Sequence, residues 1–446
     1  MAAGRAGWYA VGMIETKEIL AIHGGEKTVT EKAPASWLHG TNEIGEEEIR
    51  AVTEVLRSRV LFRYAHDPAE SAVARFEALF ASKTGAKHVL GLNSGTSALI
   101  AGLVALDVGQ GDEVLVPAYT YIATAAAVLA VGALPVLVEM DESLSMDPRD
   151  MENKITDRTT AVIPVHMRGT PCDMGRIMEI ARRRKIAVLE DCAQANGGTF
   201  AGRALGTLGD AGIFSLQHYK IAASGEGGIL ITDDRKLFER AAVYHDSAYA
   251  FWMEQRAESP EAVNRWKKMC FLGENFRMSE LHGAVALEQL KKRDGILSRT
   301  RLIKSRLWPA CEEIPGAAME TLNDRAGDCG ISLVFFMPDA AEAVNIAAAL
   351  DAEGVRCGTV FSKQFPDRHI FYHWDYVMEK RSAHRNGAPW TLEQKPPRVS
   401  YSKDMCPRTI DLLERAVMLP ITQSMTDAYV DQVIDAVRKV AQNWKR

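Results

Sequence analysis

Residues 211–232 read AGIFSLQHYKIAASGEGGILIT and place Lys220 in a glycine-rich loop between two apolar runs. The runs, at 212–216 and 228–232, are almost continuously apolar, which is typical of strands covered on both faces of a sheet. A lysine between them lies on the rim of that sheet, where burial can lower the pKa of its amine enough for imine chemistry. Lys220 is therefore the first candidate for a catalytic residue.

The sequence around this stretch predicts the fold class. From Lys87 to about Asp233, short apolar runs alternate with helical periods. This alternation is typical of an α/β domain with a mostly parallel sheet flanked by helices. After Ser279 the pattern changes to a long helix followed by a charged stretch, which indicates the start of a smaller C-terminal α+β domain.

The same pattern predicts the domain boundaries. We expect an N-terminal arm at 1–40, a large domain at 41–295 and a small domain at 296–446. The small domain should contain a strand at 330–337 and a helix at 340–353 that Gly354 ends. The stretch 381–403 is rich in proline, asparagine, glycine and charge, which predicts a long loop.

Composition excludes several classes of function. A chain of 446 residues with 47% hydrophobic content and a net charge of -5 does not resemble a nucleic-acid binder, which concentrates positive charge on one face. The only compact basic cluster, 182–185, ends a predicted helix and is interpreted as a solvated cap. The most apolar stretch, 122–138, contains Gly132 and Pro135, so no membrane span is expected.

The seven cysteines are scattered, odd in number and never form a CxxC pair. This pattern suits a reducing cytoplasm and argues against a disulfide framework or a zinc site, so no metal is expected. The first dozen residues contain no apolar run long enough for a signal peptide. We therefore expect a cytoplasmic enzyme.

Two further segments carry chemistry when they are taken with Lys220. Asn93 to Ser97 lies between a strand and a helix, where backbone N–H groups bind phosphate, although such turns are also common without a ligand. Asp191 ends the strand 186–190 on the ligand-binding rim, although it could equally be a helix cap. A phosphate turn, a carboxylate and a lysine on one rim are what a pyridoxal phosphate enzyme needs. The segment 273–280 looks locally like a capped helix start and nothing more.

The combined motifs resemble the DegT/StrS family of sugar and cyclitol aminotransferases. The resemblance rests on NSGTSAL, on Asp191-X-X-Gln194, on Phe214, Ser215 and Lys220 followed by GEGG, and on Asn275-Phe-Arg277, and it covers the chain from about Leu20 to Leu287. It implies fold type I of the pyridoxal phosphate-dependent transferases. It also implies a homodimer in which each active site lies at the subunit interface.

The resemblance assigns roles to residues around the cofactor ring. Lys220 would form the Schiff base with pyridoxal 5'-phosphate and then act as the general acid and base. Asp191 would pair with the pyridine nitrogen, Gln194 would contact the ring hydroxyl, and Tyr121 would stack on the ring face. Gly95, Thr96, Ser97 and Ser215 would hold the phosphate, together with Asn275 from the partner subunit.

The resemblance also points to substrate-binding residues, and here the chain departs from many relatives. Arg277 is the candidate for the carboxylate of the amino donor. Arg168 stands where many family members have tyrosine, and the LFRY motif that contains Arg63 and Tyr64 occurs in only some branches. Arg63 and Arg168 would either bind an anionic acceptor or form structural salt bridges. His166 is expected to support the site through a hydrogen bond, and His218 to be structural.

The expected reaction moves an amino group from glutamate or glutamine to a keto or aldehyde sugar or cyclitol, with phosphorylated or acidic acceptors included. Two alternatives remain open at this point. A close branch of the fold replaces the lysine with histidine and dehydrates deoxy sugars, which the presence of Lys220 argues against. A catalytically silent pyridoxal-binding regulator is the other, and the intact set of Lys220, Asp191 and Gln194 argues against it.

Overall fold

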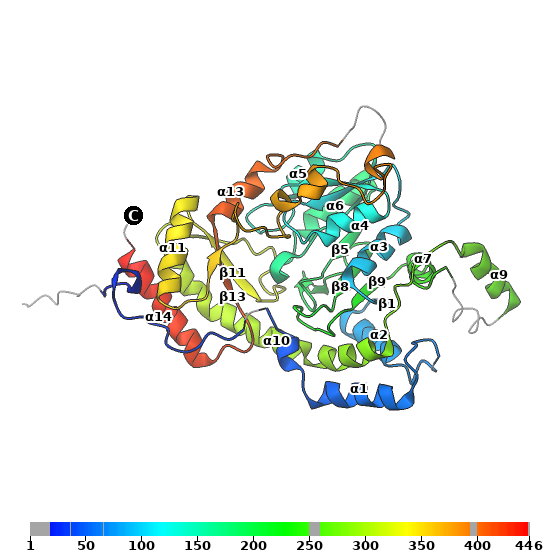
Figure 1. Cartoon of the computed structure of the whole chain (residues 1–446), viewed down its shortest axis with the longest axis horizontal. Coiled ribbons are helices and arrows are strands. Elements are labelled where there is room, and N and C mark those ends of the chain that lie inside the picture. The colour runs from blue at the N-terminus through cyan, green and yellow to red at the C-terminus, as the bar shows by residue number, and fades with distance from the viewer. Residues whose placement is uncertain (1–17, 36, 66, 249–258, 393–398, 445–446) are drawn as a thin grey trace, which may run out of the picture.

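The computed structural model describes residues 18–35, 37–65, 67–248, 259–392 and 399–444. Two sheets, each with its own helices, lie side by side, and one long helix, α10, runs beneath both (Figure 1). The first dozen residues, in which no signal peptide is expected, lie outside the described residues. No helix in the described part of the chain is long and apolar enough to span a bilayer.

The larger sheet has seven strands in the order β1-β9-β8-β5-β4-β2-β3. Its strands are parallel except β9, which runs antiparallel to both β1 and β8. The bounds are β1 His88–Leu92, β2 Glu113–Pro117, β3 Leu134–Val138, β4 Thr159–Val162, β5 Ala187–Asp191, β8 Ala211–Ser215 and β9 Gly228–Thr232. This mostly parallel mixed sheet confirms the predicted α/β class.

Helices cover both faces of this sheet, which is why its strands are apolar on both sides. The bounds are α2 Ala72–Thr84, α3 Gly95–Ala105, α4 Ala123–Ala130, α5 Pro148–Asn153, α6 Met174–Arg184 and α7 Arg235–His245, and α9 Pro260–Met269 lies beyond α7, away from the sheet (Figure 1). A short hairpin, β6 Thr199–Phe200 and β7 Arg203–Ala204, lies between β5 and β8 in sequence. Helix α3 is apolar all round because it packs against α4, α7 and the strands β8 and β9 at once. The basic cluster 182–185 ends α6 and is exposed, as predicted.

The predicted boundary at residue 295 falls inside a single helix, α10 Glu280–Glu312. Beyond it, a four-stranded sheet of order β10-β11-β13-β12 forms the core of the second unit. The bounds are β10 Ala318–Met319, β11 Ser332–Phe336, β12 Gly358–Thr359, β13 Ala416–Pro420, α11 Ala340–Ala352, α12 Asp375–Met378, α13 Pro407–Arg415 and α14 Asp427–Asn443. The predicted strand and helix correspond to β11 and α11, and the described part of 381–403 is a loop with one short 3-10 turn, Trp390–Leu392.

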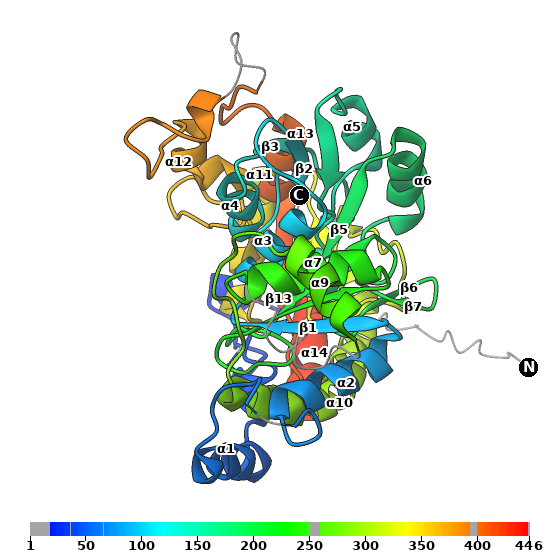
Figure 2. The same cartoon turned by 90° about the vertical axis from the view of Figure 1, so that its right-hand side faces the viewer.

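The N-terminal segment belongs with the smaller sheet. Residues 18–35 run along its helices, where the Val29 amide donates to the Glu353 carbonyl and the Thr28 hydroxyl donates to the Glu353 carboxylate. Helix α1, Glu46–Ser58, then packs on α10 at the far edge of the large sheet (Figure 2). Its outward face carries Ile49 and Leu56, both largely exposed.

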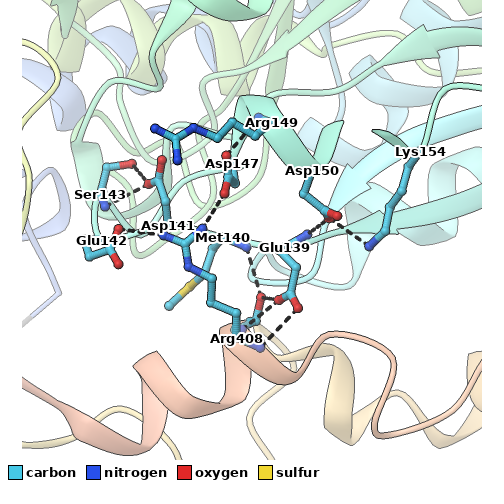
Figure 3. A network of polar contacts seen from close by, with 11 residues as sticks. Glu139, Met140, Asp141, Glu142, Ser143, Asp147, Arg149, Asp150, Lys154 and Arg408 are labelled. Atoms are coloured by element: carbon cyan, nitrogen blue, oxygen red, sulfur yellow. Dashed lines mark hydrogen bonds and ion pairs between the residues drawn. The ribbon is translucent and has the colours of Figure 1, made fainter. Parts of the chain in front are cut away.

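A polar network joins the two units on the other side of the molecule (Figure 3). Arg408, on α13, donates to the carboxylates of Asp147 and Glu142 in the loop between β3 and α5. In the same loop the Glu139 carboxylate accepts hydrogen bonds from the amide and hydroxyl of Thr409, at 2.7 and 2.6 Å. The start of α13 is therefore fixed to the large sheet.

Candidate active site

The functional residues predicted from sequence gather at one edge of the large sheet, because the carboxyl ends of its parallel strands meet there. Ser94 follows β1, Tyr121 follows β2, Arg168 follows β4 by a short turn, Asp191 ends β5 and Ser215 ends β8. Because β9 is antiparallel, the glycine-rich segment at its start also lies at this edge, beside Ser94.

Lys220 lies in the loop between β8 and β9, as predicted. Its backbone is held on both sides: its amide donates to the Gln217 carbonyl at 2.9 Å, and its carbonyl accepts from the Gly40 amide at 3.1 Å. Burial lowers the pKa of the Lys220 amine, although the negative charges of Asp191 and Glu226 oppose this shift. The amine makes no hydrogen bond or ion pair to any described residue, so it is free to react.

Asp191 is buried and accepts two hydrogen bonds, one at each carboxylate oxygen. The Ala193 amide donates to Oδ1 and the Thr124 hydroxyl donates to Oδ2, both at 3.0 Å. Burial raises the pKa of this carboxyl, while the two hydrogen bonds and the positive charge of Lys220 favour its ionised form. Thr124 in turn accepts from the Thr120 hydroxyl at 2.8 Å. No local pattern marks either threonine as a site residue, because both lie about 70 residues before Asp191 in the chain.

The start of α3 forms a cradle of backbone N–H groups. Ser94 caps the helix by accepting from the Ser97 amide at 3.0 Å, and the amides of Gly95 and Thr96 donate to no other described residue. A Cβ on Gly95 would lie 2.9 Å from the Ser215 Cβ, and one on Gly228 would lie 2.0 Å from the Ser94 carbonyl oxygen. Both positions therefore require glycine, and the cradle has the free donors that bind a phosphate.

Gln194 and Arg168 are connected through the backbone. The Gln194 side-chain carbonyl accepts from the Arg168 amide at 2.9 Å. The Arg168 Nε donates to the Tyr119 hydroxyl at 2.7 Å, and its guanidinium lies 5.3 Å from the centre of the Trp37 ring. Trp37 and Tyr119 were not predicted as site residues, and nothing in the local sequence distinguishes them from ordinary core aromatics.

A segment of the second unit closes over the loop that carries Tyr121. The amides of Thr120 and Ile122 donate to the carbonyls of His369 and Arg368, at 2.8 and 2.9 Å. The Tyr121 ring is 42% exposed and its centre lies 5.2 Å from that of the His369 ring. The His369 Nδ1 bonds to the Asp367 carboxylate at 2.7 Å. Sequence reasoning missed this pair, which lies about 250 residues after Tyr121 in the chain.

Arg63 and Tyr64 lie in a buried network away from this loop. The Arg63 guanidinium forms an ion pair with Glu77 at 2.6 Å and donates to the Gly91 carbonyl at 2.8 Å. The Tyr64 hydroxyl donates to Nε2 of His245 at 2.8 Å, since Nδ1 of that ring faces the Ala242 carbonyl. Burial lowers the pKa of His245 to about 3, so the ring is neutral.

Arg277 and Asn275 lie next to the phosphate cradle of the same chain. The Arg277 guanidinium pairs with Asp246 at 2.6 Å and lies over the Phe62 ring. The Asn275 side chain is exposed, and its backbone carbonyl accepts from the Asn93 side chain at 3.5 Å. The Asn93 amide also donates to the Phe276 carbonyl at 2.8 Å. The segment after residue 273 is thus part of the same rim.

His166 supports the rim from below. Its Nδ1 accepts from the Cys172 amide at 3.0 Å, so Nε2 carries the proton and faces Glu190 at 3.2 Å. The Glu190 oxygens also accept from the amides of Gly206, Leu208 and Gly209. This saturated set of hydrogen bonds fixes a loop and agrees with the supporting role expected of His166. His218 is exposed, and its backbone carbonyl accepts from the Thr41 hydroxyl.

These residues fit pyridoxal phosphate. The free lysine amine, the buried carboxylate, the phosphate cradle and the exposed Tyr121 ring correspond to the groups that the cofactor requires. A model of the DegT/DnrJ/EryC1/StrS aminotransferase family matches residues 42–391. The chain belongs to this family. It is a pyridoxal phosphate-dependent aminotransferase, as the sequence motifs predicted.

The names of individual relatives refer to polysaccharide biosynthesis and to a scyllo-inosose aminotransferase. The chain is 32% identical to the spore coat polysaccharide biosynthesis protein SpsC of Bacillus subtilis, over 89% of this chain and 95% of the relative. It is 33% identical to the L-glutamine:scyllo-inosose aminotransferase of Streptomyces griseus, over 75% and 78%. The solved aminotransferase of Psychrobacter cryohalolentis superposes with a TM-score of 0.72 at 26% identity, over 90% of this chain and 98% of that one.

Proposed function

We propose that this aminotransferase moves an amino group from glutamate or glutamine to a keto or aldehyde sugar or cyclitol. The observation that carries the proposal is the free, buried amine of Lys220 on the same rim as the hydrogen-bonded carboxylate of Asp191. The names of the relatives, which include an L-glutamine:scyllo-inosose aminotransferase and a GDP-perosamine synthase, support a sugar-like acceptor.

Pyridoxal phosphate, when bound, supplies an aldehyde that condenses with amines and a ring that withdraws electrons from the bond being broken. Lys220 would hold the cofactor through its amine. Asp191 would keep a proton on the pyridine nitrogen, Gln194 would contact the ring hydroxyl, and Tyr121 would cover one ring face. Gly95, Thr96, Ser97 and Ser215 would bind the phosphate.

Lys220 also moves the proton between substrate and cofactor carbons. An amine that is charged at neutral pH cannot accept a proton, so the lowering of its pKa by burial serves this role directly. The backbone of Lys220 is held by hydrogen bonds to Gln217 and Gly40, which limits the movement of the loop that carries the amine.

The donor carboxylate is assigned to Arg277. Its ion pair with Asp246 keeps the guanidinium extended beside the Phe62 ring, and only one of its terminal nitrogens contacts Asp246. The other terminal nitrogen is available for a carboxylate. Tyr64, which follows Arg63 in the chain, would be a neutral hydrogen-bonding residue on the side of the site where Arg277 lies.

A homodimer with shared active sites completes the proposal. Helix α1 and the loop that follows it expose the apolar side chains of Ile49, Leu56, Leu61 and Phe62. A second copy of the chain that covers these apolar side chains would bring its Asn275 to the phosphate of this chain. Asn275 also lies near the cradle of its own chain, so the two arrangements must be separated by experiment.

Subunit exchange separates them. K220A and N275A homodimers should each be impaired, and mixing them should produce heterodimers with one doubly impaired site and one intact site. Activity above the average of the two parents, approaching half of wild type per heterodimer, supports an Asn275 that serves the partner. No recovery, once differently tagged subunits are shown to exchange, places Asn275 in its own chain's site.

The reaction itself is tested by its first half. Glutamate or glutamine added to the holoenzyme without an acceptor should convert the absorbance of the lysine-bound cofactor into that of its amine form, with one equivalent of keto acid released. A lyase or a silent regulator would leave both signals unchanged. That result would refute the proposal.

A further inference from the structure

The guanidinium of Arg168 lacks the acidic partner that the other two arginines of the predicted site possess. Arg63 pairs with Glu77 and Arg277 pairs with Asp246. Within the described ranges no carboxylate lies within ion-pair distance of Arg168, and its two terminal nitrogens donate to no residue. A half-buried guanidinium of this kind keeps two parallel N–H donors unused.

The backbone of Arg168 is held in a conformation that arginine disfavours. Its φ of 55° and ψ of 23° lie in the left-handed region, which costs about 1 kcal/mol for a residue with a Cβ. The Gln194 side chain accepts from the Arg168 amide and fixes this turn beside the predicted cofactor ring. Glycine or asparagine would adopt this turn at a lower cost in free energy. We therefore infer that the side chain of Arg168 has a function that compensates for the backbone strain.

Two aromatic rings aim the side chain. The Arg168 guanidinium carbon lies 5.3 Å from the Trp37 ring centre and 5.8 Å from that of Tyr119. Trp37 is itself in the left-handed region, with φ of 67°. The Tyr119 hydroxyl accepts from Arg168 Nε, and its own hydrogen has no acceptor among the residues that the structure describes. The terminal nitrogens of Arg168 and the hydroxyl of Tyr119 thus form a set of donors without an acceptor.

One carboxylate lies near enough to act on Arg168 at longer range. Burial raises the pKa of Asp367, but the hydrogen bonds and charge of His369, with a smaller contribution from the charge of Arg168, hold it below its ordinary value. Asp367 is already bonded to the amide and ring of His369, at 2.9 and 2.7 Å. Asp367 therefore interacts with the charge of Arg168 at long range but leaves the N–H donors of Arg168 unoccupied.

We propose that Arg168, with Tyr119, binds a carboxylate or phosphate group of the acceptor, and that Arg63 does not. The inference rests on the aminotransferase function proposed above and names the class of its acceptor as an acidic or phosphorylated sugar. Trp37 covers the guanidinium on one side and excludes water from the ion pair, which strengthens it. The two terminal N–H donors and the planar fork match both anions.

The test compares ligands that share a sugar ring and differ in charge. Binding of D-glucose 6-phosphate, D-glucuronate and D-glucose to the holoenzyme is measured by calorimetry for wild type, R168Q and R368Q. Arg368 is exposed at the same edge of the site, so R368Q removes the same charge without touching the Trp37 and Tyr119 pocket. Using the holoenzyme keeps the phosphate cradle of α3 filled by the cofactor.

Wild type should bind at least one of the two acids roughly 10- to 100-fold more tightly than D-glucose, the range set by hydrogen bonds to a charged group. R168Q should lose this preference and R368Q should keep it. Preference for the phosphate over the carboxylate, or the reverse, identifies the anion. No preference in wild type, or an equal preference in R168Q, overturns the inference.

A kinetic comparison separates the acceptor from the donor, which is also an acid. The Michaelis constant for glutamate, taken from the half-reaction, should rise less in R168Q than the dissociation constant for the preferred acid. Equal rises would assign Arg168 to the donor and overturn the inference. A wild-type enzyme that fails the glutamate half-reaction refutes the proposed function instead, so the two failures are distinguishable.

Discussion

The hydrogen bond from Thr124 to Asp191 should set the strength of the electron-withdrawing ring, and T124V tests it. Asp191 is buried, and only two hydrogen bonds favour its charged form within the described residues. A hydrogen bond to a charged group stabilises it by about 1.5–3 kcal/mol, so its loss should raise the pKa of Asp191 further. A carboxylate that more readily becomes neutral protonates the pyridine nitrogen less completely.

If the whole of that loss reached the transition state, turnover would fall by about 10- to 150-fold. T124S retains a hydroxyl at the same position and should fall much less. T120V leaves the bond between Thr124 and Asp191 in place and should resemble T124S rather than T124V.

Two measurements check this expectation. The glutamate half-reaction is followed by rapid mixing, and the ionisation of Asp191 in each apoprotein is followed by carboxyl-carbon NMR of aspartate-labelled protein. The NMR titration does not depend on turnover, so it separates an electrostatic effect from a general loss of structure. Equal titration of Asp191 in T124V and T124S would refute the reasoning, whatever the activities.

Three further outcomes are expected. K220A should bind the cofactor without a covalent link, so borohydride reduction and peptide mapping should label no peptide in the variant and only the Lys220 peptide in wild type. Burial lowers the pKa of His39 to about 4, so the folded state binds fewer protons than the unfolded state at acidic pH. The free energy of unfolding should therefore fall by up to about 3 kcal/mol as the pH drops from 6.5 to 4. Chemical unfolding at pH 7 and pH 4.5 should show a smaller fall for H39Q than for wild type, and equal falls would contradict the role of His39. R408A should lower the free energy of unfolding by about 1 kcal/mol, because Arg408 is 41% exposed and water partly screens its two ion pairs. R149A removes no ion pair to a described residue, so it should leave the free energy of unfolding unchanged.

The sequence predicted the large sheet and its rim because the relevant signals are local. An unbroken apolar run indicates a strand covered on both faces, and the residue after such a run must lie at the edge of the sheet. Lys220, Asp191 and Ser94 all follow runs of this kind, so their meeting at one edge follows from parallel strand order. Residues 228–232 were expected to form a strand, but the antiparallel direction of β9 was not predicted. This direction places the first residues of β9 at the rim, next to the carboxyl ends of β1 and β8.

The domain boundary was harder to predict, because a sequence does not show whether a charged residue is buried or exposed. The stretch 288–301 is rich in charged residues, and the smaller domain was expected to begin there. In the structure it is the middle of α10, where the Arg293 guanidinium reaches the Asn196 side chain. Further along the helix, buried Lys304 lies 2.9 and 2.6 Å from the carboxylates of Glu320 and Asp328. Charged helical residues of this kind are buried only because distant partners neutralise them.

Arg63 and Arg168 show why the substrate side of the site could not be read from sequence. Both are arginines in motifs near predicted site residues, and both were candidates for an anionic acceptor. The difference lies in their partners: Glu77 forms an ion pair with Arg63, whereas Asp367, whose charge interacts with that of Arg168, is already bonded to His369. An anion that binds Arg63 must compete with a buried ion pair, and breaking such a pair costs about 3–5 kcal/mol. An anion that binds Arg168 displaces no ion pair, so the full charge-assisted interaction contributes to its affinity.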